Sequence, residues 1–320
     1  KQAYRGSDSL QIGRRRLDTH FHGLTALGID IEINHTYHFS STRLTGTEIV
    51  LDEASVTATE NILMAATLAE GETIIYNAAC EPHVQDLANL LNAMGASVSG
   101  IGTNRIHVQG VPSLHGTTHR VQPDFIEIGS FIAAAVATGG ALTIPHAGDP
   151  LVLNIMQRTY ARLGVQWRVD DAGTLHLPQQ IDRTIQGDIG NDTPKIEDGI
   201  WPAFPSDLMS VAIVLATQTK GTTLFFEKMF ESRMYFVDHL MSMGANIIPC
   251  DPHRVVVVGP TQLRGSILTS PDIRAGMAML IAACCANGKS LIKNASVIDR
   301  GYEAIEDRLT QLGANMVREL

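Results

Sequence analysis

The sequence has no hydrophobic run long enough to cross a membrane, few cysteines and too little positive charge to balance its acids. Its longest apolar candidate, 211–216, is far short of the ~20 residues that a membrane-spanning helix needs, which excludes a membrane protein. The four cysteines include no C-x-x-C pair, so we expect reduced thiols in a cytoplasmic protein. The net charge of −9 disfavours nucleic-acid binding.

Several motifs of cofactor and nucleotide chemistry are also missing. There is no G-x-x-x-x-G-K-[ST], no G-x-G-x-x-G after a strand, and no serine-hydrolase elbow. The twelve histidines are scattered, without a carboxylate cluster at ligand spacing, so we expect no metal and no bound cofactor. The chain begins at Lys1 without an initiator methionine, and we expect an N-terminal portion to be missing.

What the sequence does contain is repetition. With 320 residues, 44% hydrophobic and 18% charged, it has the material for about two folded domains. An Ala-rich helical stretch, a glycine and a β-rich run occur together four times, as in AATLAEGETIIYN from Ala65. A second phrase, [LM]-G-[AVI], occurs five times, and its glycines are 67, 69, 80 and 69 residues apart: Gly28, Gly95, Gly164, Gly244 and Gly313.

One repeat illustrates the predicted unit. The patterns indicate helices over 58–70 and 82–94, each followed by a glycine. β-branched runs indicate strands over 48–51, 73–75, 97–99 and 105–108. We therefore expect small mixed sheets packed against helices, an α/β (α+β) fold. Gln122-Pro123-Asp124 is the best candidate for a hinge, which gives an incomplete N-terminal lobe over 1–122 and a second lobe of three repeat units over 123–320.

Polar groups that carry chemistry gather in turns. Four turns present arginine, in IGRRRLD from Ile12, FESRM from Phe230, SPDIRAG from Ser270 and IDRGYE from Ile298. Each arginine taken alone is compatible with a solvated surface cation. Four such turns in a repeat protein favour a cleft that binds a small polyanion, because the guanidinium fork suits carboxylate and phosphate.

Two further segments precede helices. Ser206 and Asp207 follow two prolines, and either is compatible with a helix N-cap, whereas Asp207 is also placed to accept a proton from a hydroxyl. Ser55, Thr57 and Thr59 are again compatible with a cap or with a phosphate seat at a helix start.

Taken in order, these motifs resemble those of the UDP-N-acetylglucosamine enolpyruvyl transferases. The likeness runs from Gly6 to Leu320 and includes IGRRRLD, TATENILMAATLAEGETIIYNAACEP, PDFIEIGSFIAAA, FPSDLMSVA, FESRM, DIRAG and IDRGYEAIEDRLTQLGA. The resemblance implies a two-domain inside-out α/β barrel built from repeated small α/β units. It implies transfer of the enolpyruvyl group of phosphoenolpyruvate to the 3′-hydroxyl of UDP-N-acetylglucosamine, with release of phosphate, as the first committed step of peptidoglycan synthesis.

The resemblance also assigns residues. Asp207 matches the carboxylate that takes the hydroxyl proton, and the cationic clamp for phosphoenolpyruvate matches Arg15, Arg233, Arg274 and Arg300, the last also catalytic. The nucleotide-sugar positions match Arg15, Arg16, Leu17, Asp18, Ser55, Val56, Thr57, Met229 and Glu231, and Asp124 matches an aspartate near the hinge.

Some positions depart from the family pattern. The mobile loop, 5–13 here, has no cysteine, and its only acid in reach of the general-acid position is Asp8. The family's catalytic lysine lies in a region that precedes this chain, so we expect these 320 residues to be inactive by themselves. Two alternatives stay open: a degenerate paralogue that only binds UDP-sugar, and a transferase with another acceptor such as shikimate phosphate.

Overall fold

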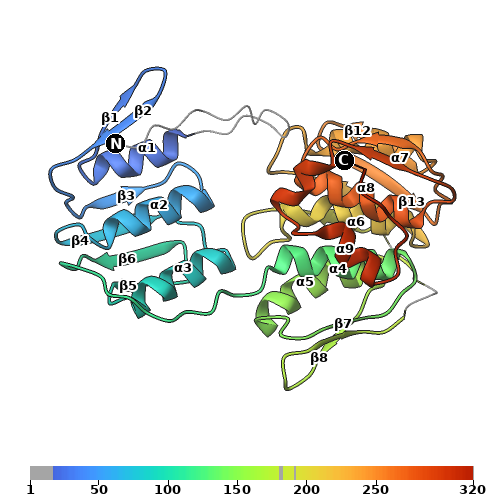
Figure 1. Cartoon of the computed structure of the whole chain (residues 1–320), viewed down its shortest axis with the longest axis horizontal. Helices are drawn as coiled ribbons and strands as arrows, with labels where there is room; N and C mark the ends of the chain where they lie inside the picture. The colour runs from blue at the N-terminus through green and yellow to red at the C-terminus, as the bar shows by residue number, and fades with distance from the viewer. Residues whose placement is uncertain (1–16, 180–182, 191, 320) are drawn as a thin grey trace. The chain divides into compact units, whose positions relative to one another are not determined.

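The computed structural model describes residues 17–179, 183–190 and 192–319. Its chain divides into two compact units (Figure 1). Within the described residues, the first unit comprises 17–122 with Ile200–Pro202, and the second comprises 123–199 and 203–319. No helix of the described residues is both long and apolar enough to span a membrane.

Among its described residues, the first unit holds a four-stranded sheet, a two-stranded hairpin and three helices. The sheet has the order β3-β4-β6-β5, with β3 parallel to β4 and the other pairs antiparallel. Apolar residues of its strands and of α2 share one core, which includes Leu63 and Ile75. The elements are α1 (Asp18–Ala26), β1 (Asp30–Ile33), β2 (Tyr37–Ser40), β3 (Glu48–Val50), α2 (Val56–Ala66), β4 (Glu72–Tyr76), α3 (Pro82–Ala93), β5 (Ser97–Ser99) and β6 (Arg105–Gln109).

The second unit repeats this plan. Its four-stranded sheet has the order β10-β11-β13-β12, with the same parallel first pair, and is accompanied by sheets β7-β9-β8 and β14-β15. Its strands are β7 (Leu142–Ile144), β8 (Arg168–Val169), β9 (Leu175–Leu177), β10 (Lys195–Glu197), β11 (Gly221–Phe226), β12 (Asn246–Asp251), β13 (Arg254–Gly259), β14 (Ile267–Thr269) and β15 (Leu291–Lys293). Its helices are α4 (Phe125–Ala137), α5 (Pro150–Arg162), η1 (Ser206–Leu208), α6 (Met209–Thr217), η2 (Arg233–Phe236), α7 (Val237–Ser242), α8 (Ile273–Cys285), η3 (Ala295–Arg300) and α9 (Ile305–Gln311).

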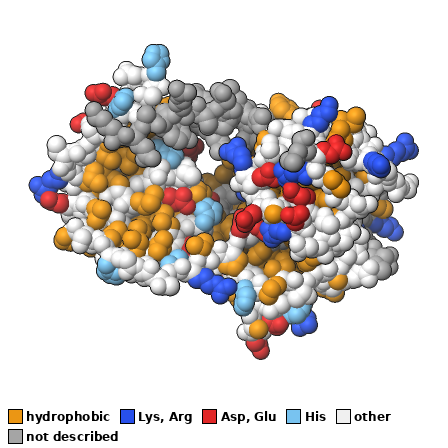
Figure 2. All heavy atoms as spheres, viewed as in Figure 1, with side chains coloured by type: hydrophobic (Ala, Val, Ile, Leu, Met, Phe, Trp, Pro, Cys, Tyr) orange, Lys and Arg blue, Asp and Glu red, His pale blue; other side chains and the backbone are white. Residues whose placement is uncertain are grey.

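Three helices form the centre of the second unit. Helices α4, α6 and α8 contact one another pairwise, and all nine residues of α6 are buried. A helix that is apolar on every side is stable in water only when protein surrounds it. On the face shown in Figure 2, acidic and basic side chains are interspersed over the second unit, so its polar surface carries both signs of charge.

The predicted repeat is confirmed element by element in the first unit, with boundary shifts of a few residues. The largest shift is in α2, which ends at Ala66 rather than at residue 70, because residues 67–69 form a turn that leads into β4. Gly95 has φ +97° and follows the last turn of α3 as predicted. Gly71 instead lies directly before β4, again with positive φ.

Candidate active site

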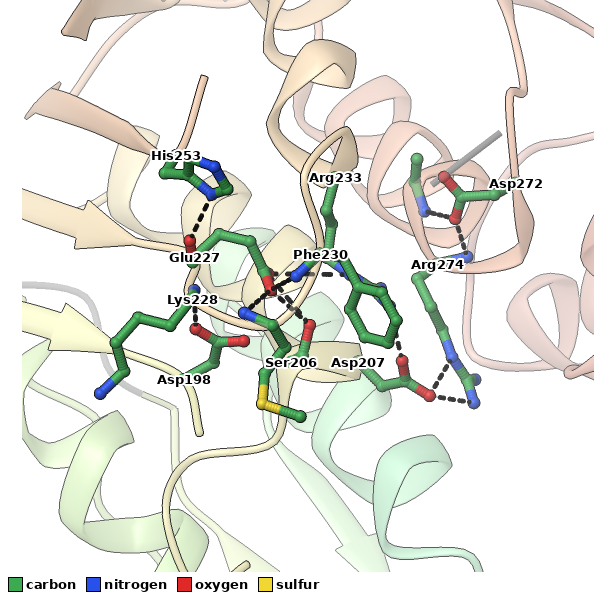
Figure 3. A network of polar contacts seen from close by, with 12 residues as sticks. Asp198, Ser206, Asp207, Glu227, Lys228, Phe230, Arg233, His253, Asp272 and Arg274 are labelled. Atoms are coloured by element: carbon green, nitrogen blue, oxygen red, sulfur yellow. Dashed lines mark hydrogen bonds and ion pairs between the residues drawn. The ribbon is translucent and has the colours of Figure 1, made fainter. Parts of the chain in front are cut away.

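Asp207 lies in η1, a single 3-10 turn that precedes the buried helix α6. The interpretation of Ser206 or Asp207 as a helix cap is wrong, because neither η1 nor α6 has a side-chain cap hydrogen bond. The Asp207 carboxylate instead accepts hydrogen bonds from two arginines of distant segments (Figure 3). Its side chain is half-buried, with 37% of its surface exposed.

Arg233 begins η2, after the loop that follows β11. Its guanidinium is 3% exposed, and its Nη2 donates to Asp207 Oδ1 at 3.0 Å. The same group lies over the Phe230 ring, 4.7 Å from the ring centre, a cation–π contact that fixes the guanidinium plane. Asp207 and Phe230 together hold a buried cation in one orientation.

Arg274 is the second residue of α8. The N-cap of that helix is Asp272, whose carboxylate accepts from the backbone N–H of Arg274 and Ala275. The Arg274 side chain binds Asp207 Oδ2 through Nε at 2.9 Å and Nη2 at 2.8 Å, and it lies 5.5 Å from the Tyr302 ring centre. Two charged donors of Arg274 thus converge on one carboxylate oxygen, and Oδ1 is left to Arg233.

The charges of Asp207, Arg233 and Arg274 together favour anion binding. Burial by itself would raise the pKa of Asp207, but Arg274 and Arg233 outweigh it and hold the pKa of this carboxyl below its ordinary value. Burial acts to lower the pKa of Arg274, but Asp207 and Tyr302 outweigh it and raise that pKa. In the described part of the chain, the buried Nη1 atoms of Arg233 and Arg274 have no hydrogen-bond partner. Two cations thus share one carboxylate and retain donors for a further anion.

Arg300 ends η3 and is exposed. Within the described residues its side chain has no hydrogen bond or ion pair, so the structure does not join it to the Asp207 cluster directly. Its neighbour Gly301 does pack there, since a Cβ atom on Gly301 would lie 3.3 Å from Arg274 Nη1 and 2.6 Å from Ile273 Cγ2.

In the first unit, the starts of α1 and α2 lie together. Ser55 caps α2, with its hydroxyl accepting from Ala58 N at 3.4 Å, as predicted. Thr57 Oγ1 lies 3.2 Å from His20 Nε2, and His20 Nδ1 is 2.9 Å from Asn61 Nδ2. His20 on α1 therefore joins two segments that the family resemblance assigns to the same ligand.

The other predicted residues have the following places. Leu17 and Asp18 lie at the start of α1, Val56 is the first residue of α2, Met229 and Glu231 lie in the exposed loop after β11, and Asp124 is the N-cap of α4. Asp124 Oδ1 accepts from Ile126 N at 2.8 Å and from Glu127 N at 3.2 Å. Asp8, Arg15 and Arg16, and with them the predicted mobile loop 5–13, lie outside the described residues.

Sequence reasoning overlooked the buried carboxyls Glu227 and Asp198, the supporting residue His20 and the aromatic partner Tyr302. Glu227 and Asp198 each follow a strand that ends in the same sheet edge, and both are fully buried. A charged residue directly after an apolar strand, as in LFFEK from Leu224, was the available signal.

Known proteins similar to this chain fall into one group. The family model described as EPSP synthase (3-phosphoshikimate 1-carboxyvinyltransferase) matches residues 6–309. A UDP-N-acetylglucosamine 1-carboxyvinyltransferase from Treponema pallidum is 54% identical over 308 residues, which are 96% of this chain and 72% of that protein. The protein of the same name from Treponema denticola is 52% identical over 305 residues, which are 95% of this chain and 71% of that protein.

Solved structures agree on the fold. The enolpyruvyl transferase NikO from Streptomyces tendae matches with a TM-score of 0.82 at 23% identity, over 94% of this chain and 72% of that one. EPSP synthase from Acinetobacter baumannii matches with a TM-score of 0.70 at 20% identity, over 98% of this chain and 74% of that one.

The chain therefore belongs to the EPSP synthase family of carboxyvinyltransferases, and its mixed α/β fold is that of the enolpyruvyl transferases. Its high identity places it with the members of that family named UDP-N-acetylglucosamine 1-carboxyvinyltransferase.

Proposed function

We propose that the protein transfers the enolpyruvyl group of phosphoenolpyruvate to the 3′-hydroxyl of UDP-N-acetylglucosamine and releases phosphate, the first committed step of peptidoglycan synthesis. The observation that carries this proposal is the Asp207 carboxylate held between Arg233 and Arg274, in a chain 52–54% identical to carboxyvinyltransferases of that name. It combines a proton acceptor with a receptor for an anionic donor.

The chemistry assigns a task to each group. Asp207 takes the proton of the sugar 3′-hydroxyl while the sugar oxygen bonds to C2 of phosphoenolpyruvate. At the same time the methylene carbon C3 gains a proton. We propose Asp8 as the source of that second proton. Elimination then breaks the bond between C2 and the phosphate oxygen, C3 returns a proton, and phosphate leaves with its charge dispersed over the arginines.

We propose that Arg233, Arg274 and Arg300, with Arg15, bind phosphoenolpyruvate. The Nη1 atoms of Arg233 and Arg274, which have no hydrogen-bond partner among the described residues, support this assignment, because a bound phosphate or carboxylate would satisfy them. Arg300 is exposed, and its neighbour Gly301 packs against Arg274, which supports its recruitment to the same anion.

We propose that the nucleotide sugar is bound by the starts of α1 and α2 and by the loop after β11. The free N–H groups of a helix start favour the diphosphate. The assigned residues are Arg15, Arg16, Leu17, Asp18, Ser55, Val56, Thr57, Asp124, Met229 and Glu231.

The finer architecture is also proposed. Mutual packing of α4, α6 and α8 at the centre of the second unit supports an inside-out α/β barrel, with helices inside and sheets outside. We propose that one lobe comprises residues 1–122 and the other residues 123–320. All four cysteines are unpaired, which supports action in the reducing cytoplasm.

Release of phosphate from phosphoenolpyruvate, with UDP-N-acetylglucosamine or shikimate 3-phosphate as acceptor, tests the proposal. We expect turnover with the nucleotide sugar, and release only with shikimate 3-phosphate would overturn the assigned acceptor. Absence of release with both, together with calorimetric binding of the nucleotide sugar, would indicate the degenerate paralogue. The comparisons favour neither alternative, and they lend no support to the expectation that these 320 residues are inactive.

A further inference from the structure

The carboxyl groups of Glu227 and Asp198 have no exposed surface. They lie beside the cluster formed by Asp207, Arg233 and Arg274 (Figure 3). They come directly after β11 and β10, which pair in parallel with Phe226 opposite Glu197. The next residue of each strand therefore reaches the same sheet edge. Burying two acids at one place is costly unless hydrogen bonds and a proton compensate.

Glu227 connects three parts of the site. The Ser206 hydroxyl donates to its Oε1 at 2.9 Å or its Oε2 at 3.0 Å. The backbone N–H groups of Met229 and Phe230 donate to Oε1 at 3.1 and 3.0 Å. Arg233 Nε lies 3.7 Å from Oε2. One side chain thus hydrogen-bonds the residue before Asp207 and the turn after β11, and it lies within ion-pair distance of the buried arginine.

Asp198 anchors the same turn from the neighbouring strand. Its Oδ1 accepts from Lys228 N at 2.5 Å. Three consecutive backbone N–H groups, those of 228–230, therefore end on two carboxyl groups. Such a turn is fixed by its acceptors, and so is the Phe230 ring beneath Arg233.

Both carboxyl groups are fully buried at the ends of adjacent strands, an arrangement that favours one shared proton over two negative charges. Burial first, and then hydrogen bonding to Asp198 and its charge, raise the pKa of Glu227 to about 8. With Asp207 ionised, a shared proton leaves two carboxylate charges against the two guanidinium groups of Arg233 and Arg274. Loss of the proton would add a third negative charge and oppose binding of an anionic donor.

We propose that Glu227 and Asp198 form a positioning pair, which holds one proton between its carboxyl groups, anchors the 228–230 turn and orients Arg233 without neutralising it. This inference rests on the proposed function. The other charged or titratable groups nearby are Arg233, Asp207, Lys228 with its partner Glu197, and His253, which faces the Glu227 backbone carbonyl through Nδ1 at 2.9 Å.

Two substitutions at Glu227 separate positioning from simple packing. Glu227→Gln keeps an oxygen acceptor for Ser206, Met229 and Phe230, and its NH2 replaces the shared proton as donor to Asp198. We expect its kcat/KM for phosphoenolpyruvate to stay within about threefold of the wild type, whereas Glu227→Ala lowers it about 10- to 100-fold, as loss of a contact to a charged group does. Glu197→Gln, at a half-buried neighbour paired with Lys195 and Lys228, is the matched control and should leave kcat/KM for phosphoenolpyruvate unchanged.

The pH profile supplies the readout that packing would not move. In the wild type, kcat/KM for phosphoenolpyruvate should fall above pH about 8 as the pair loses its proton, and Glu227→Gln should lack that fall. Three results would each overturn the proposal. They are an equal loss of kcat/KM in Glu227→Gln and Glu227→Ala, an identical alkaline fall in the wild type and Glu227→Gln, and full activity of a folded Glu227→Ala.

Measurements on the ligand-free protein keep this inference distinct from the proposed function. The Met229 and Phe230 amides should resist hydrogen exchange in the wild type and in Glu227→Gln but exchange freely in Glu227→Ala. An infrared carbonyl band of a protonated carboxyl should be present at neutral pH and disappear in Glu227→Gln. If both hold but the wild type releases no phosphate, the proposed function fails and the carboxyl pair stands. Absence of both would refute the pair whatever the enzyme does.

Discussion

Replacement of Asp207 by asparagine removes the proton acceptor while it preserves the shape of the side chain. Removal of a positioned general base lowers kcat by about 10²- to 10⁴-fold, and we expect a loss in that range. The side-chain amide of Asp207→Asn also directs an NH2 group at one of two guanidinium groups, where the wild-type carboxylate accepts from Arg233 and Arg274 at 2.8–3.0 Å. Arg274 and Arg233 outweigh burial and hold the pKa of Asp207 below its ordinary value, which favours the ionised carboxylate that the proposed base requires.

The same substitution has a predictable effect on stability and donor binding. A hydrogen bond to a charged group contributes about 1.5–3 kcal/mol, and the 37% exposure of Asp207 reduces the expected loss to about 1–2 kcal/mol. The affinity for phosphoenolpyruvate should stay the same or increase, because the arginines lose the carboxylate that competes with this substrate.

Phosphate release, calorimetry with phosphoenolpyruvate and a thermal melt measure the three effects. Asp238→Asn, an exposed acid on α7, is the control. Turnover of Asp207→Asn within about fivefold of the wild type would refute the assignment of Asp207 as the base.

Three further substitutions test the supporting structure. Gly301→Ala should cost about 1–3 kcal/mol and raise KM for phosphoenolpyruvate, because its Cβ would lie 2.6 Å from Ile273 Cγ2, whereas Gly116→Ala, with open space around it, should do neither in the same melts and assays. His20→Ala should raise KM for the nucleotide sugar. Burial lowers the pKa of His20, despite the opposing charge of Glu53, so the stability of the wild type should decline as pH falls below about 6.5. Urea titrations should show a weaker decline in the variant. Asp124→Ala should lose about 0.5–2 kcal/mol with the α4 cap and Asp124→Asn almost nothing, so a loss of activity in a thermally stable Asn variant would indicate substrate contact, and full activity would refute it.

The repeated phrases made most of the first unit predictable from sequence. Helix and strand periodicity, with glycine after helices, is a local property of the chain, and it placed β5 and the start of α3 at the residues observed. Boundaries failed where a turn competes with the helix, as after Ala66, because hydrogen bonds beyond the helix decide that end.

The sequence by itself identified the candidate site residues, because the motifs that hold these arginine, aspartate and glycine residues resemble those of a known family. Tertiary structure decided which of them meet. Arg233 and Arg274 come from segments 41 residues apart, and only the packing of α6, α8 and the β11 loop brings both to Asp207. The buried Glu227 and Asp198 pair likewise depends on the register of two strands separated by a helix, a long-range pairing that no local pattern encodes.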